Sequence, residues 1–358
     1  MYIYIHIPFC NSICSYCDFP KLLYDKKYTN KYLNTIKEEI LSRYQDEEVL
    51  SIYIGGGTPT SLDLVELQYL LELTTIFKKG KHIEFTIESN VESLDLDKIK
   101  LLKKYGVNRV SLGVQSFDEN TLKELNRRHT NEDVTRVIAN LKEEGFENIS
   151  IDYIYGVNSD IKETKKDIKT FLELDIPHIS CYSLIIENNT VFGINSRDYI
   201  EEDIEEEMYH YIENTLTNEG YIHYEISNYA KDGYQSIHNL NYWNNGEYYG
   251  FGLGATSYIN SHRVTNTKNL TKYLNKDYID IDEYEDKDLS ISNTFMLGFR
   301  KVKGINIIDF QNKYNINITD IEPVKELLNE GKLILENNHL YIPPKYFYLS
   351  NEIIIKFI

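Results

Sequence analysis

Residues 4–19 read YIHIPFCNSICSYCDF, and the rest of the chain is organised around this stretch. Cys10, Cys14 and Cys17 form a C-x3-C-x2-C pattern directly after an expected strand, Tyr2–Ile7. Three thiolates in one loop can bind three irons of a [4Fe–4S] cluster, whereas four cysteines would saturate it. The pattern therefore predicts a cluster that has three protein ligands and one iron open to a small molecule.

Zinc and disulfides are the alternative roles for these cysteines. A structural zinc site needs four ligands, usually in C-x2-C pairs; His6 could supply a fourth, but the spacing does not fit the usual zinc modules. Disulfides are disfavoured because four cysteines in 358 residues, without a secretory signal, indicate a reducing compartment. The fourth cysteine, Cys181, lies in an apolar run, so we expect it in the core.

The composition narrows the class of function. Lys plus Arg is 38 and Asp plus Glu is 56, which gives a formal charge of −18. Non-specific nucleic-acid binding needs a basic surface, so we expect no nucleic-acid partner. No apolar run approaches the ~20 residues that span a bilayer, and the N-terminus carries no signal-peptide pattern. We expect a soluble, cytoplasmic protein of two or three domains, or one large domain with an appendage.

The first half of the chain alternates short apolar runs with amphipathic stretches, which predicts βα units around a parallel sheet. The expected strands are Tyr2–Ile7, Leu50–Ile54, Ile83–Glu88, Arg109–Gly113, Ile149–Ile154 and His178–Ser183. The expected helices lie near Tyr28–Arg43, Leu64–Phe77, Leu96–Tyr105, Val134–Glu144 and Ile161–Leu174. These six units are too few for a complete eight-stranded barrel. In such folds the functional site forms at the C-terminal ends of the strands.

Glycine and polar residues lie at or just after the ends of these strands. Residues 55–59, Gly-Gly-Gly-Thr-Pro, follow the second strand, and glycine lets a backbone pass close to a ligand. Glu88 ends the third strand, Gln115 and then Arg127 follow the fourth, and Asp152 lies in the fifth. Taken singly, these residues could be a turn, a helix cap or a surface cation. Together they predict a ligand site at one end of the sheet.

These motifs give the chain a resemblance to the radical S-adenosylmethionine (SAM) proteins, and within them to the coproporphyrinogen III dehydrogenase-like branch. YIHIPFC at 4–10, GGGTPT at 55–60, VQSF at 114–117 and IDYIYG at 151–156 carry the resemblance, which covers essentially the whole chain. It implies an α/β fold: a partial (β/α)6 TIM-like barrel plus a small C-terminal helical, winged-helix-like domain. The corresponding ranges are 1–185 for the radical SAM barrel, 186–285 for a barrel extension and 286–358 for the C-terminal domain.

The resemblance also implies cofactors and site residues. A [4Fe–4S] cluster is implied at Cys10, Cys14 and Cys17, with SAM bound to its open iron. The implied SAM contacts are Tyr4, Tyr16, Gly56, Gly57, Thr58, Glu88, Gln115, Arg127 and Asp152. Their chemistry agrees, because a carboxylate suits the ribose diol or the amine of SAM and an arginine suits its carboxylate. The chain departs from the branch at Val157-Asn158, where the branch commonly has Leu-Pro.

The segment HNLNYW at 238–243 carries a second cofactor prediction. H-N-x-x-Y-W resembles the motif of the HemW subgroup of heme chaperones and of some heme-degrading relatives. Imidazole can bind heme iron, so His238, Tyr242 and Trp243 are predicted to contact heme. The alternative is a packed aromatic corner with a hydrogen-bonded histidine, and His6, His210 and His223 are rival iron ligands.

Two features separate a chaperone from a dehydrogenase. The dehydrogenase has a fourth cysteine two residues after the third, where this chain has Phe19. It also has an N-terminal extension before the cysteine loop, whereas the first cysteine here is already residue 10. The resemblance therefore implies that the protein binds heme as cargo and delivers it to heme-requiring membrane enzymes. It leaves enzymatic turnover open. The alternatives are a coproporphyrinogen III dehydrogenase or another radical SAM enzyme acting on a tetrapyrrole, and a cluster-bearing binding protein that does not use SAM.

Overall fold

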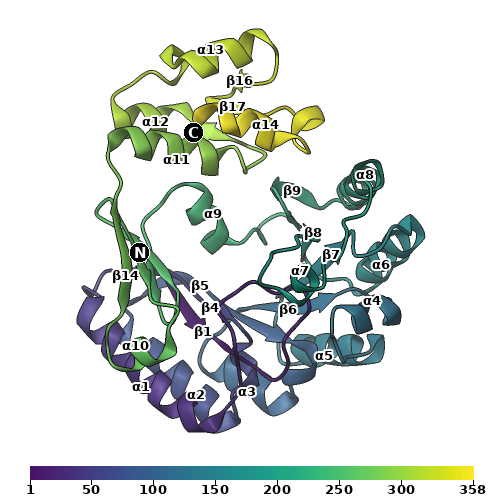
Figure 1. The fold of residues 1–358 in the computed structure, drawn as a ribbon, viewed down its shortest axis with the longest axis vertical. Coiled ribbons are helices and arrows are strands. Elements are labelled where there is room, and N and C mark those ends of the chain that lie inside the picture. Colours follow the sequence, from purple (N-terminus) through teal and green to yellow (C-terminus); the bar gives the residue numbers. More distant parts are fainter.

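A nine-stranded sheet forms the centre of the protein, and the computed structural model describes all residues 1–358 (Figure 1). The strand order is β11-β1-β4-β5-β6-β7-β8-β10-β9. The six strands of the predicted βα units are all parallel: β1 (Tyr2–Ile7), β4 (Val49–Gly56), β5 (Lys79–Asn90), β6 (Arg109–Gln115), β7 (Asn148–Tyr155) and β8 (His178–Ser183). The partial barrel and the α/β class predicted from the sequence are confirmed.

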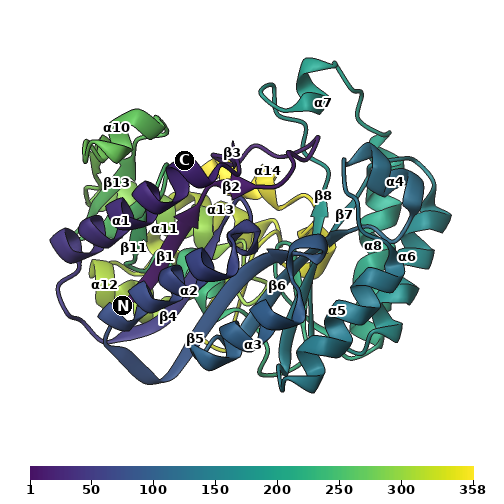
Figure 2. The ribbon, with the colours of Figure 1, turned by 90° about the horizontal axis from the view of Figure 1, so that it is seen from below.

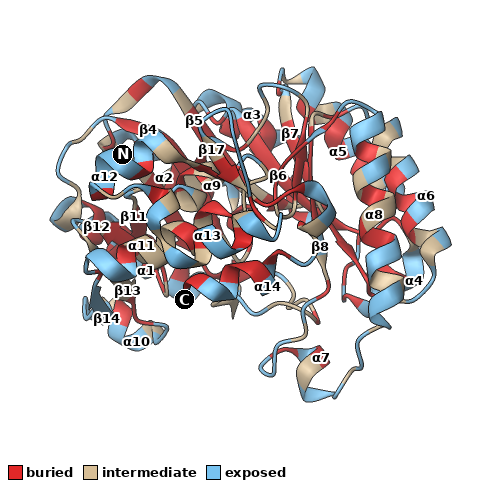
Figure 3. Cartoon of the chain, turned by 90° about the horizontal axis from the view of Figure 1, so that it is seen from above, coloured by how far each residue is buried: buried red, intermediate tan, exposed pale blue.

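Helices cover the outer face of these strands (Figure 2). They are α1 (Lys26–Arg43), α2 (Leu64–Leu73), α3 (Leu96–Lys104), α4 (Glu119–Glu124), α5 (Asn131–Glu143), α6 (Ile161–Glu173) and α8 (Glu202–Asn218). Local sequence sets where they begin. For example, the Asp63 side chain accepts hydrogen bonds from the backbone of Val65 and Glu66 at the start of α2, and Glu66 bonds back to the Asp63 N–H. Figure 3 shows the sheet buried and the outer faces of α6 and α8 exposed.

Strand β6 shows how the sequence separates core from interior. Val110, Leu112 and Val114 belong to the 53-residue apolar core beneath the helices. The alternate residues on this strand, which include Arg109 and Ser111, line a cavity on the opposite face. Because side chains alternate across a strand, one short segment supplies both the core and the site.

The second half of the chain completes the sheet at both edges. Strand β11 (Tyr249–Phe251) pairs in parallel with β1, and β10 (Asn228–Ala230) and β9 (Ile222–Glu225) pair antiparallel beyond β8. None of the strands expected from the sequence corresponds to β11 or β10. Helix α9 (Ile237–Trp243) lies on the inner side of the sheet, opposite the covering helices (Figure 1).

The C-terminal part has an apolar core of its own, with 15 buried residues. A small sheet of β12 (Thr256–Ile259), β13 (His262–Asn266) and β14 (Ile279–Tyr284) leads into it. The elements of the C-terminal part are α11 (Lys287–Gly298), α12 (Ile307–Tyr314), α13 (Glu322–Asn329), the hairpin β16 (Ile334–Glu336) and β17 (His339–Tyr341), and α14 (Ser350–Ile354). The exact division at residues 185 and 285 remains a prediction. None of the helices is both long and apolar enough to cross a membrane.

Candidate functional site

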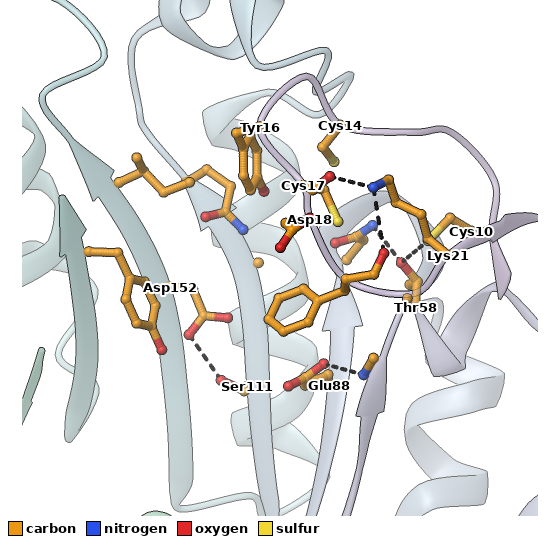
Figure 4. A pocket seen from close by; sticks show the side chains of 18 of the residues that line it. Cys10, Cys14, Tyr16, Cys17, Asp18, Lys21, Thr58, Glu88, Ser111 and Asp152 are labelled. Carbon is orange, nitrogen blue, oxygen red and sulfur yellow. Dashed lines mark hydrogen bonds between the residues drawn. The ribbon is translucent and has the colours of Figure 1, made fainter. Parts of the chain in front are cut away.

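A cavity of ≈ 450 Å³ lies at the C-terminal ends of the central strands, beneath the cysteine loop (Figure 4). Eleven of the twelve residues predicted to hold the cluster and SAM line it: Cys10, Cys14, Tyr16, Cys17, Gly56, Gly57, Thr58, Glu88, Gln115, Arg127 and Asp152. Tyr4 is the exception. It lies on β1, where its hydroxyl is 2.9 Å from Nδ1 of His6, so its SAM contact stays a prediction. The ring's other nitrogen, Nε2, is 2.8 Å from the Pro20 carbonyl, so His6 has no free nitrogen.

The three loop cysteines are free thiols that face one space. Thr58 Oγ1 donates to Cys10 Sγ over 3.7 Å, and Arg127 Nη1 donates to Cys14 Sγ over 3.7 Å. Burial raises the pKa of Cys10 to about 11, so its thiolate needs a cation to stabilise it. A Cβ on Gly57 would lie 2.9 Å from Cys10 Sγ, which explains a glycine there. These residues fit a [4Fe–4S] cluster.

Glu88 is the central acid of the site. Its carboxylate accepts hydrogen bonds from the Tyr53 hydroxyl (2.8 Å) and the Gly56 N–H (2.9 Å). Burial raises its pKa to about 7. A Cβ on Gly55 would lie 2.8 Å from this carboxylate, and Gly56 has a φ of +114°, which favours glycine. The glycine triplet therefore lets the loop approach both Glu88 and the cysteines.

Arg127 joins the cluster loop to the SAM residues. Its guanidinium donates to Asn90 Oδ1 (2.8 Å), to the Gly113 carbonyl (2.6 Å) and to Glu92 Oε2 (3.2 Å). Its Nε is buried and has no partner, so one donor of the fork is left over. An unpaired buried donor beside a cavity suits a ligand carboxylate.

Asp152 and Gln115 complete the predicted set. Ser111 Oγ donates to Asp152 Oδ1 over 3.2 Å, and burial raises the pKa of this acid. Gln115 ends β6 with a φ of +74°, a conformation that side-chain-bearing residues rarely adopt. Backbone strain of this kind persists only where surrounding contacts fix the conformation, and it is common at ligand sites. Here the strained residue lines the cavity.

Arg109 also lines the cavity, and the sequence analysis missed it. It is 2% exposed and its Nε has no hydrogen-bond partner. Its positive charge lowers the pKa values of Glu88 and Asp152, against the effect of burial. The available signal was an arginine at the start of an otherwise apolar strand, because buried charges are rare unless paired.

The predicted heme residues lie at the start and end of α9. His238 lies inside the barrel, near the N-terminal end of β4. His238 is fully buried. Its Nδ1 is 2.9 Å from Ser51 Oγ and its Nε2 is 2.8 Å from the Tyr242 hydroxyl. Arg300 lies over the Trp243 ring at 5.8 Å. As they lie here, His238 has no free nitrogen and Tyr242 is its partner, so the structure favours the packed-corner alternative for this segment.

Comparison with known proteins places this geometry in a class. Residues 4–173 match the radical SAM superfamily. Over 99% of this chain and 89% of the other, the fold is similar to coproporphyrinogen III oxidase (HemN) from Escherichia coli, a radical SAM enzyme (TM-score 0.87). The identity is 21%, so this likeness shows the fold alone. The protein is thus a radical SAM protein, a class that implies a [4Fe–4S] cluster and SAM.

Curated relatives narrow the class further. The chain is 38% identical to heme chaperone HemW of Lactococcus lactis, covering 99% of this chain and 96% of that protein. It is 35% identical to heme chaperone HemW of Bacillus subtilis, covering 98% and 97%. The chain belongs to the HemW family. The resemblance found in the sequence is confirmed.

Proposed function

We propose that this protein is a heme chaperone, which binds a [4Fe–4S] cluster, SAM and heme and delivers heme to heme-requiring proteins, membrane enzymes among them. The observation that carries the proposal is full-length similarity to curated heme chaperones at 38% and 35% identity. Phe19 supports it, because this residue lines the cavity where the dehydrogenase has a fourth cysteine.

In this proposal Cys10, Cys14 and Cys17 hold the cluster, which supplies an open iron and an electron when bound. Glu88 and Asp152 accept hydrogen bonds from the ribose diol or the amine of SAM. Arg127 offers its unpaired Nε to the carboxylate. Thr58 and Gly57 keep the backbone close to Cys10. Glu88 and Asp152 lie on strands β5 and β7, and Arg127 is held by its hydrogen bonds to Asn90, Gly113 and Glu92, so these groups are in place before ligands bind.

The test is anaerobic reconstitution of the cluster, followed by two assays on the same sample. Heme titration should give one heme per chain. Incubation with coproporphyrinogen III, SAM and a reductant should give no protoporphyrinogen at a catalytic rate. Catalytic product formation without stoichiometric heme binding would reject the chaperone in favour of the dehydrogenase.

A further inference from the structure

The mouth of the cavity carries an apolar surface that nothing in the protein covers. Phe19 is 65% exposed and Ile185 is 64% exposed, yet both line the cavity that holds the predicted cluster and SAM residues. Phe19 belongs to the cysteine loop, and Ile185 follows β8. Large apolar side chains that stay exposed beside a cavity indicate a binding surface.

The segment after β8 is held in place without these exposed side chains. The helical turn α7 (Val191–Ile194) projects from the body of the molecule, on the side of the cysteine loop (Figure 2). Its Phe192 is buried in a small core with Leu184 and donates its N–H to the Ser15 carbonyl over 3.0 Å. Ile194, by contrast, is 71% exposed. The outer apolar residues are therefore available to a ligand.

A cation lies at the same mouth. Lys21 lines the cavity, and its ammonium group donates to the backbone carbonyls of Cys17 and Phe19. No carboxylate forms an ion pair with it. In a chain with a formal charge of −18, a lysine without an acidic partner suits a ligand carboxylate.

We propose that heme docks at this mouth, with its porphyrin against Phe19 and Ile185 and a propionate near Lys21. The proposal rests on the proposed function and names the site at which the cargo binds. Heme is a flat apolar ring with carboxylates at one edge. The mouth offers apolar side chains and the Lys21 ammonium, which forms no ion pair with Asp18 or Glu187 on the same lining. The cavity itself, ≈ 450 Å³, has the size of a pocket for one small ligand, so a macrocycle is left outside when SAM is inside.

The decisive experiment is heme titration of the full-length, cluster-reconstituted protein in four forms: wild type, Ile185→Asp, Ile185→Leu and Val65→Asp. Val65 is the matched control, because it is 78% exposed on α2 and does not line the cavity. Ile185→Asp should weaken heme binding by about tenfold or more, since a contacting aliphatic side chain becomes a charge. Ile185→Leu and Val65→Asp should bind like the wild type, and SAM affinity should be equal in all four.

Three outcomes separate the site from the function. Equal heme affinity in Ile185→Asp and wild type overturns the docking site and leaves the chaperone proposal standing. Loss of both SAM binding and heme binding in Ile185→Asp also overturns the docking site, because the substitution then disturbs the whole cavity. A wild type without stoichiometric heme rejects the proposed function itself. Phe19→Ser, assayed at wild-type iron content, should repeat the loss from the cysteine loop.

Discussion

The barrel interior has two halves: an upper half at the C-terminal ends of the strands and a lower half at their N-terminal ends. Polar side chains from the strands line both halves, yet only the upper half is a cavity. In the lower half α9 supplies partners. Glu84 accepts the N–H groups of Ile237 and His238, each over 2.9 Å, and Ser51 bonds to the His238 ring. These contacts join β5, through Glu84, and β4, through Ser51, to a helix that lies 153 to 187 residues away in sequence.

The upper half has the same kind of lining without such a partner. Glu88 lies on β5, the strand that carries Glu84, and Asp152 lies on β7, but the groups above them are the free thiols of the cysteine loop. Buried polar groups are costly unless they are satisfied. Helix α9 fills the lower half, whereas the upper half, where Arg127 Nε has no partner, stays open as the cavity. Polar strand positions alone therefore do not mark a site; what matters is whether a later segment fills the space.

The largest expected effect concerns the cluster in the upper half. Replacing Cys10, Cys14 and Cys17 with alanine should abolish the brown absorbance and the iron content after anaerobic reconstitution, because no other thiol reaches the cavity. Cys181→Ala is the control. Cys181 is a free thiol buried in the main core, so its variant should keep full iron. Iron loss in Cys181→Ala would contradict the ligand assignment.

The next effect tests the lower half. His238→Ala should lower the free energy of unfolding by about 3 kcal/mol, because it leaves a cavity and two unsatisfied hydroxyls, those of Ser51 and Tyr242. Chemical denaturation of the ligand-free protein measures this, with exposed Val65→Ala as the reference.

Heme titration of the same His238 variant, below its unfolding range, then separates packing from binding. If heme docks at the cavity mouth, the affinity and the Soret band should match the wild type. Loss of heme with unchanged stability would instead make His238 an iron ligand, and the lower half would be a site as well.

The sequence predicted the strands and the ligand-bearing ends well for a physical reason. Apolar runs, turn residues and helix caps are local, and Tyr2–Ile7 and His178–Ser183 match their strands end to end. The filling of the lower half depends on contacts between distant segments. The short helix α9 has no local signal that it enters the barrel, so the sequence left open whether His238 binds heme or packs inside the protein. Arg109 was missed similarly, because its long side chain reaches the cavity from the far end of β6.

A smaller effect is expected at the side of the cavity. Arg127→Ala should weaken SAM binding by tenfold to about a hundredfold, the loss of one charge-assisted interaction, while iron content stays unchanged. Isothermal titration of the cluster-loaded protein measures it. Arg136 provides a control, because it forms only an exposed ion pair with Asp133 on α5. Equal SAM affinity in Arg127→Ala and Arg136→Ala would remove Arg127 from the ligand set.

The smallest effect is a pH dependence that belongs to the upper half alone. Burial raises the pKa of Glu88 to about 7, while Tyr53, the Gly56 N–H and Arg109 favour its charged form. Asp152 on β7, separated from the Glu88 strand by β6, has a raised pKa as well, and its charge opposes ionisation of Glu88. Only the carboxylate can accept two hydrogen bonds from SAM without first losing a proton. Binding should therefore weaken as the pH falls below about 7 and level off above it.

The sign and the size of this effect follow from a single proton. SAM affinity should fall by at most about tenfold for each pH unit below the pKa of Glu88, because one proton must leave before SAM binds. Glu88→Gln should bind SAM more weakly and lose most of this dependence between about pH 6 and about pH 8. Arg109→Met should move the midpoint to higher pH, since it removes the cation that favours the Glu88 carboxylate. An unchanged midpoint in Arg109→Met would show that the unpaired arginine serves packing, as the groups of the lower half do.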